Sequence, residues 1–181
     1  MNRKKKSFLH TVNINKLDVH QLNPDAVGIQ NSVFSTVIER KFKSKPIRTL
    51  LDTGASYSVI HINLLKQLAN EGFQYEVLKT IRTTPISASN HSLQIIGDVI
   101  LNLQFEGEND KNLRLNKIRC TILKELNCPI IIGMEVLRLS RLKLERKFIT
   151  MFHRRVPLCD AENDLQMEVL ESTVFEDRDL T

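Results

Sequence analysis

The sequence predicts a mainly β domain with two short helices. Segments with alternating apolar and polar residues recur along the middle of the 181-residue chain, a period typical of half-buried strands. Turn-forming residues separate these segments, and only two segments have helical spacing. Many short strands with two brief helices indicate one β domain, which we expect over residues 31–156.

The first regular segment is a predicted hairpin that ends at an acidic triplet. Residues 33–42 alternate between two faces, and residues 43–46 form the expected turn. Residues 47–51 return as a second strand, whose last two positions are leucines. This hairpin leads the chain directly into the Asp-Thr-Gly triplet at residues 52–54.

A helix and a polar turn are expected next. Residues 61–70 have apolar side chains at helical spacing, and Gly72 follows as a common helix stop. Residues 77–86 read as an extended segment, and residues 87–92 form a polar turn. The strand pattern then resumes over residues 93–105.

The last part of the domain is also expected to consist of strands and a short helix. Residues 118–122 alternate as a strand, and residues 129–133 are wholly apolar up to a final glycine, which indicates a strand buried on both faces. A short helix is expected over residues 134–141. A hairpin should follow over residues 142–152, with its turn near residues 145–147.

The two ends of the chain have unbalanced charge and no sustained apolar period. Residues 1–30 begin with a basic cluster and are expected to form a flexible basic segment. Residues 157–181 are expected to form an acidic, disordered tail. A short basic terminus is usually solvated, so we expect no nucleic-acid partner for this domain.

The composition excludes several classes of protein and of site. No window is long and apolar enough for a membrane span, and residues 7–13 are too short and polar for a secretory signal, so we expect a cytoplasmic protein. The cysteines Cys120, Cys128 and Cys159 form no CxxC pair and are expected to be reduced, structural thiols. We expect no metal site and no cofactor.

The acidic triplet has the residue types that one kind of hydrolysis needs. Cleaving a peptide bond without a metal or a covalent nucleophile requires a base that activates water and an acid that protonates the departing amine. Two carboxylates that share one proton can do both, because like charges at about 3 Å cannot both ionise. Asp52 supplies one carboxylate and Thr53 a hydroxyl that can hold the loop. Gly54 permits a turn that a Cβ would obstruct and leaves room for a partner carboxylate.

The triplet alone is weak evidence, since Asp and Gly are ordinary turn residues. Its context indicates more, because an apolar strand precedes it and Val59-Ile60 and a helix follow it. The apolar run Ile131-Ile132-Gly133 then occurs about eighty residues later. In this order of elements, residues 32–152, about two-thirds of the chain, resemble the retroviral-type (retropepsin-like) aspartic peptidases. They are especially similar to those of retrotransposons with long terminal repeats.

The resemblance implies the acid protease fold, a retropepsin-like closed β-barrel with one lobe per subunit. Because the chain has one Asp-Thr-Gly triplet, the second carboxylate would come from a second copy. The protein would then be an aspartic endopeptidase that acts as a homodimer on an extended peptide or polyprotein. Asp52 would be catalytic, and Thr53 and Gly54 would support its loop. The polar turn over residues 87–92 would be the flap. The residues expected to bind substrate are Ala55, Ser56, Ala88, Ser89, Asn90, Ile132 and Gly133.

One departure from the family pattern concerns an ion pair. Viral members often carry an acidic residue directly after Asp-Thr-Gly-Ala, which pairs with an arginine just past the second glycine. This chain has Ser56 and Met134 at those positions, so that pair is missing. Glu135 stands where retrotransposon-like members commonly have Asp.

Two other polar residues invite a catalytic role that we do not expect. Asp98 follows Gly97, but it lies in a predicted strand and no Thr-Gly follows it. His61 comes just after the motif and is expected to mark the start of the helix. Aspartic peptidase chemistry needs no histidine.

Two other functions remain open on the sequence. The first is a catalytically inactive retropepsin-like module for dimerisation or peptide binding, which the intact triplet disfavours. The second is the ubiquitin-linked cytosolic relative with the same fold, although this chain has no ubiquitin-like segment. If the chain is the retroelement enzyme, its location would be the cytoplasm or the retroelement particle.

Overall fold

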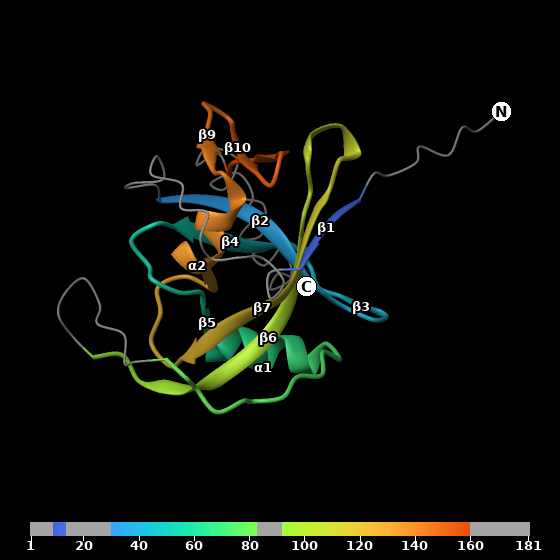
Figure 1. The fold of residues 1–181 in the computed structure, drawn as a ribbon. Coiled ribbons are helices and arrows are strands. Elements are labelled where there is room, and N and C mark those ends of the chain that lie inside the picture. The colour runs from blue at the N-terminus through green and yellow to red at the C-terminus, as the bar shows by residue number, and fades with distance from the viewer. Residues whose placement is uncertain (1–8, 14–29, 83–91, 160–181) are drawn as a thin grey trace, which may run out of the picture.

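The described part of the molecule, residues 9–13, 30–82 and 92–159 of a computed structural model, is mainly β-structure with two short α-helices (Figure 1). This confirms the fold class expected from the sequence. The strands are β1 (His10–Asn13), β2 (Gln30–Glu39), β3 (Phe42–Lys43), β4 (Ile47–Asp52), β5 (Val59–His61), β6 (Ile95–Phe105), β7 (Leu113–Leu123), β8 (Ile130–Ile132), β9 (Lys143–Leu144), β10 (Phe148–Met151) and β11 (Arg154–Pro157). The helices are α1 (Ile62–Asn70) and α2 (Met134–Leu137), with 3-10 turns η2 (Glu108–Asp110) and η3 (Arg138–Ser140).

Within the described residues, six strands close into a barrel. β2 pairs with β4, β4 with β8, β8 with β5, β5 with β7, and β7 with β6, which returns to β2. The long antiparallel pair of β6 and β7 runs across the molecule in Figure 1. Because the ring is closed, none of these six strands leaves its backbone groups unpaired along a whole edge.

The order of strands around β8 determines where the acidic triplet lies. β4 runs parallel to β8 on one side, with Leu51 opposite Ile132. β5 runs antiparallel to β8 on the other side, with Val59 opposite Ile131. The chain that leaves β4 must therefore cross over the end of β8 before it can enter β5. This crossing segment, residues 53–58, begins directly after Asp52.

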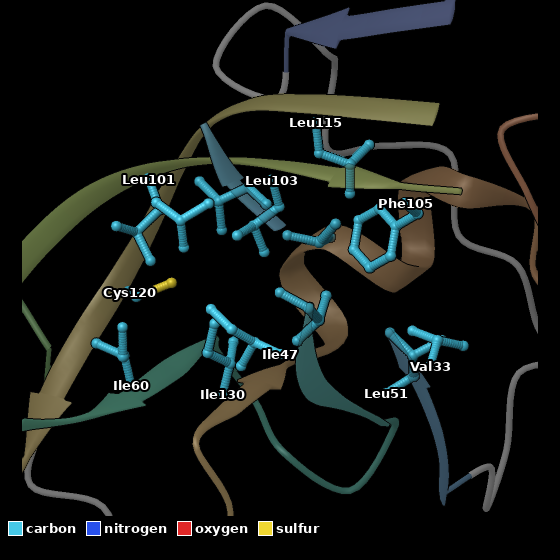
Figure 2. Close-up of a cluster of buried hydrophobic side chains, with 14 of the residues drawn as sticks. Val33, Ile47, Leu51, Ile60, Leu101, Leu103, Phe105, Leu115, Cys120 and Ile130 are labelled. Carbon is cyan, nitrogen blue, oxygen red and sulfur yellow. The ribbon is translucent and has the colours of Figure 1, made fainter. Parts of the chain in front are cut away.

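The barrel interior is filled by apolar side chains from every strand of the ring. In β6 the alternate residues Val99, Leu101, Leu103 and Phe105 are buried, as the period of two requires. Figure 2 shows Leu101, Leu103 and Phe105 directed into a shared interior, where side chains from the other strands meet them. Truncating one such leucine to alanine typically costs about 2–5 kcal/mol of stability.

The helix and the C-terminal hairpin were predicted from sequence, but some boundaries differ. α1 begins at Ile62, and Gly72 follows its C-cap with a φ of 103°, a conformation that favours glycine. The first turn falls at Arg40 and Lys41 instead of residues 43–46, so β3 doubles back on β2 before β4 begins. Arg40 adopts a φ of 48°, which the alternation of apolar residues could not indicate.

Three further differences between the expected and the observed elements concern where a strand or helix begins and ends. The strand expected over residues 93–105 begins only at Ile95, as β6, and its pairing with β7 shifts register between Ile95 and Gly97. The expected helix over residues 134–141 is α-helical only as far as Leu137 and continues as the 3-10 turn η3. Of residues 77–86, those up to 82 are described, and they contribute one isolated bridge, between Leu78 and Asp98.

Both ends of the described chain pair with the barrel. β1 lies parallel to β7, with His10 opposite Leu113, a strand that no pattern in the sequence predicts. At the other end Leu158 bridges to Val33, and the amide of Cys159 donates to Ser32 O at 2.8 Å. The paired chain therefore reaches past the expected boundary at residue 156. The flexible and disordered character expected of the ends falls largely on residues 1–8, 14–29 and 160–181, which lie outside the described residues, so the domain division stays a prediction.

None of the helices in the described ranges has the length and apolar character needed to cross a membrane.

Candidate active site

Asp52 is the last residue of β4 and is partly exposed where the strand gives way to the crossing segment. Its Oδ1 accepts a hydrogen bond from the amide of Gly54 at 2.7 Å, and its carbonyl accepts one from the amide of Ala55 at 3.3 Å. These bonds hold the carboxylate close to its own backbone and fix its direction. A Cβ at Gly54 would lie 3.1 Å from Asp52 Oδ1, so glycine there keeps space around the acid.

The crossing segment is fastened to the end of β8. The amide of Met134 donates to Ala55 O at 2.8 Å, and the amide of Gly133 donates to Ser58 Oγ at 3.1 Å. Gly133 is packed so closely that a Cβ there would lie 2.5 Å from the carbonyl carbon of Tyr57. The glycine that ends β8 is therefore required by the close approach of the crossing segment. The segment that follows the Asp-Thr-Gly triplet is thus in direct contact with the backbone at the end of β8.

An ion pair that sequence reasoning missed lies beside this contact. Glu135 Oε1 accepts the amide hydrogen of Ser58 at 2.8 Å, and its Oε2 pairs with Arg82 Nη1 at 2.6 Å. The Arg82 guanidinium also lies over the ring of Tyr57, 4.9 Å from its centroid. Arg82 Nε is buried and has no hydrogen-bond acceptor within the part of the chain that the structure describes. This ion pair therefore joins the start of α2 to the crossing segment and to Arg82.

Asp98 is a buried carboxylate whose oxygens are both engaged. Its Oδ2 accepts from Arg119 Nε at 2.7 Å, and its Oδ1 accepts from Thr121 Oγ1 at 3.0 Å. Burial raises the pKa of Asp98, but the hydrogen bonds from Arg119, Thr121 and Thr80 outweigh it and hold the pKa below its ordinary value. Asp98 is therefore a structural anion, which agrees with its exclusion as a second catalytic acid.

The predicted site residues differ in their exposure to solvent, and therefore in how accessible they are to a peptide. Ser56 is exposed, and Thr53 and Ala55 are partly exposed. Ile132 and Gly133 are buried, so of the expected substrate contacts that the structure describes, Ala55 and Ser56 are the ones with exposed surface. The remaining expected contacts, Ala88, Ser89 and Asn90 of the flap turn, lie outside the described residues.

His61 and the three cysteines occupy positions that suit a structural role. His61 precedes α1, and its Nδ1 accepts the amide hydrogen of Asn63 at 2.9 Å, so it caps the helix as expected. All three cysteines are free thiols. Cys120 is fully buried in the core, and burial raises its pKa far above the ordinary value. Burial, followed by the charge of Asp52, raises the pKa of Cys128.

No protein-family model matches the chain, and no curated protein matches it closely. Solved structures are similar to it, among them these three. The retroviral protease-like domain of Ddi1 from Leishmania major has 13% identity and a TM-score of 0.49, covering 72% of this chain and 94% of that one. The EIAV protease in complex with the inhibitor HBY-793 has 15% identity and a TM-score of 0.45, covering 66% and 96%. A retropepsin-like aspartic protease from Rickettsia conorii has 11% identity and a TM-score of 0.41, covering 72% and 85%. At these identities and TM-scores, the functional conclusion must rest on the residues of this chain.

Proposed function

We propose that the chain is an aspartic endopeptidase of the retroviral type that hydrolyses peptide bonds as a homodimer, with Asp52 as its catalytic residue. The observation that carries the proposal is the position of Asp52. Its carboxylate lies at the end of a barrel strand, held by the amide of Gly54 and partly exposed, in a loop fastened to a second chain segment. Thr53 and Gly54 support that loop, and Ala55 and Ser56 are the proposed substrate contacts among the described residues.

The need for a second copy follows from the single Asp-Thr-Gly triplet of the chain, and it is supported by Asp98 and Glu135, two acids that are linked to the crossing segment. Asp98 is enclosed, and both of its oxygens accept hydrogen bonds. Glu135 is engaged on one oxygen by Ser58 and on the other by Arg82. Neither acid is available to share a proton with Asp52. A two-fold axis that places two copies of Asp52 together meets the requirement, because an isologous contact sets a residue against its own copy.

The chemistry divides between the two Asp52 carboxylates. The ionised one takes a proton from a water molecule, whose oxygen attacks the carbonyl carbon of the peptide bond. The protonated one donates a hydrogen bond to the carbonyl oxygen as negative charge develops there. When the carbon–nitrogen bond breaks, the amine leaves with a proton returned from the pair, and the carboxyl product retains the water oxygen. The two apparent pKa values of such a pair belong to the pair as a whole.

The finer parts of the proposal concern substrate and location. An extended peptide would lie along Ala55 and Ser56 and be covered by the flap turn, where Ala88, Ser89 and Asn90 would contact it. Its source would be the polyprotein of a retrotransposon with long terminal repeats, cleaved in the cytoplasm or inside the retroelement particle. These statements rest on the resemblance of the motifs alone.

The proposal is tested by cleavage of unfolded protein. Purified protein is incubated with a mixture of denatured polypeptides at mildly acidic pH, and the new termini are sequenced. The matched control is Asp52→Asn prepared in the same way, because asparagine keeps the size of the side chain and the acceptor for Gly54. Cleavage by the wild type and none by the variant is expected. If the wild-type dimer binds peptides and cuts none, the protein is instead the inactive binding module.

A further inference from the structure

The segment over residues 78–82 is tied to the barrel at both of its ends. At one end Leu78 and Asp98 exchange backbone hydrogen bonds of 2.8 and 2.9 Å, and Arg119 Nη2 donates to Lys79 O at 3.0 Å. At the other end Arg82 pairs with Glu135. We refer to residues 78–82 as the arm.

The two ties are joined through one residue of the crossing segment. From the first tie, Thr121 links Asp98 to Ser58, since Thr121 Oγ1 donates to Asp98 Oδ1 and Thr121 N donates to Ser58 O, both at 3.0 Å. From the second tie, Glu135 links Arg82 to Ser58 through the Ser58 amide. Ser58 is fully buried and six residues after Asp52. The arm and the crossing segment therefore belong to one closed network of hydrogen bonds and ion pairs.

Within this network Glu135 divides its two oxygens between the site and the arm. A displacement of Arg82 would pull on the carboxylate that also holds the Ser58 amide, and a displacement of Ser58 would move the anchor of Arg82. The pair is partly shielded, with 21% of the Arg82 side chain and 24% of the Glu135 side chain exposed, so it is less screened than a surface pair.

We propose that Arg82 and Glu135 are positioning residues that hold the arm and the crossing segment in register, so that Ala55 and Ser56 of the crossing segment are placed correctly for a bound peptide. This inference rests on the proposed function. Neither residue touches the reacting atoms, and the carboxylate of Asp52 keeps its bond to Gly54 without them. Loss of the pair should therefore weaken substrate binding more than the chemical step.

The kinetic test is a double-mutant cycle of Arg82→Met, Glu135→Gln and the double variant. Methionine keeps apolar packing on Tyr57 without the charge, and glutamine keeps an acceptor for Ser58 N. Each single variant should raise KM for a peptide substrate about fivefold while kcat stays within about twofold, and the double variant should be no worse than either one. Arg82→Lys, which keeps the positive charge, should recover most of the wild-type KM. A fall in kcat with unchanged KM, or strictly additive effects, would overturn the proposal.

The chain offers a matched control in Arg155. Its Nη1 pairs with Glu108 at 2.7 Å, and its guanidinium lies 4.3 Å from the centroid of the Phe148 ring, an arrangement like that of Arg82 with Glu135 and Tyr57. Arg155 joins the β6–β7 turn to the C-terminal strands and takes no part in the arm network. Arg155→Met should therefore leave KM unchanged, and an equal rise in KM there would show a non-specific effect.

Amide hydrogen exchange separates this inference from the proposed function. In Arg82→Met the amides of Ser58 and Leu78 should exchange at least about threefold faster than in the wild type, and in Arg155→Met they should not change. This readout needs no cleavage. Unchanged exchange at Ser58 in both Arg82→Met and Glu135→Gln would refute the coupling even in an active enzyme. Faster exchange in a protein that cuts no peptide would uphold the coupling and reject only the peptidase.

Discussion

Gly133 and Tyr57 lie against each other backbone to backbone, although 76 positions separate them in the chain. The contact exists because the segment between β4 and β5 must cross the end of β8, and Gly133 is the residue at that end. The φ of Gly133 is not in the left-handed region, so glycine is needed at this position because it lacks a Cβ.

Gly133→Ala should destabilise the protein, because its Cβ would lie 2.5 Å from the carbonyl carbon of Tyr57, which is a backbone atom and not the end of a flexible side chain. We expect a loss of about 1–3 kcal/mol in the free energy of unfolding, measured by urea denaturation. Gly54→Ala is the control, since its Cβ would approach the Asp52 side chain, with Oδ1 nearest at 3.1 Å, and no backbone atom among the described residues. That variant should lose under about 1 kcal/mol and yet cleave peptides poorly. Equal stability losses in both would contradict this account.

Asp52→Asn should abolish cleavage while leaving the fold intact. The amide oxygen of asparagine can still accept from Gly54 N, which preserves the loop, but the side chain cannot take a proton from water. The cleavage rate should fall at least about a hundredfold, whereas the midpoint of thermal unfolding should change little. A variant that kept more than about one part in a hundred of the wild-type rate would rule out the carboxylate as general base.

Activity should depend on the concentration of the protein, because one subunit supplies one Asp52. Activity per subunit should rise with enzyme concentration well below the dimer dissociation constant and level off above it. The measurement is initial rate against total enzyme, with sedimentation at the same concentrations. Constant specific activity from a protein that sediments as a monomer would end the homodimer proposal.

Mixing wild-type and Asp52→Asn subunits gives a sharper form of the same test. With random pairing, an equal mixture contains about one-quarter fully wild-type dimers. If mixed dimers are inert, activity per wild-type chain should fall to about half at saturating dimerisation. Activity that stays at the full value would mean that each subunit works alone.

Asp98 should contribute to stability only above the acid range. Its pKa is lower in the folded protein than its ordinary value of 3.8, so the folded state favours the ionised form. The contribution is complete above the unfolded-state pKa and is lost as the pH falls through the folded-state pKa. The difference in unfolding free energy between the wild type and Asp98→Asn should therefore be largest above about pH 5 and shrink below about pH 4. A difference that does not vary with pH would show that Asp98 is not ionised in the folded protein.

Local pattern was sufficient for much of the fold and for the choice of a candidate catalytic residue. Alternation over residues 33–42 and 99–105 predicted β2 and β6, and helical spacing with a stop at Gly72 predicted α1. The Asp-Thr-Gly triplet identified Asp52 as the residue at the end of a strand. These signals are readable because burial of one face imposes a period on neighbouring residues of the same segment.

Only the tertiary structure decided the contacts between segments that are distant in sequence, because the spacing of apolar residues within one segment does not indicate its partner. β1 shows no alternation because only Val12 of its four residues is buried, and it is held by pairing with β7. The pairing of Glu135 with Arg82 joins a helix start to an arm 53 positions earlier, and neither residue is marked by its neighbours. Asp98 looked like an isolated acid in a strand until the barrel brought Arg119 and Thr121 beside it. These charged side chains meet their partners only after strands that are distant in sequence have paired, and that pairing depends on the whole barrel. The sequence by itself therefore determined the fold class and the candidate acid, and the tertiary structure decided the network that holds them in register.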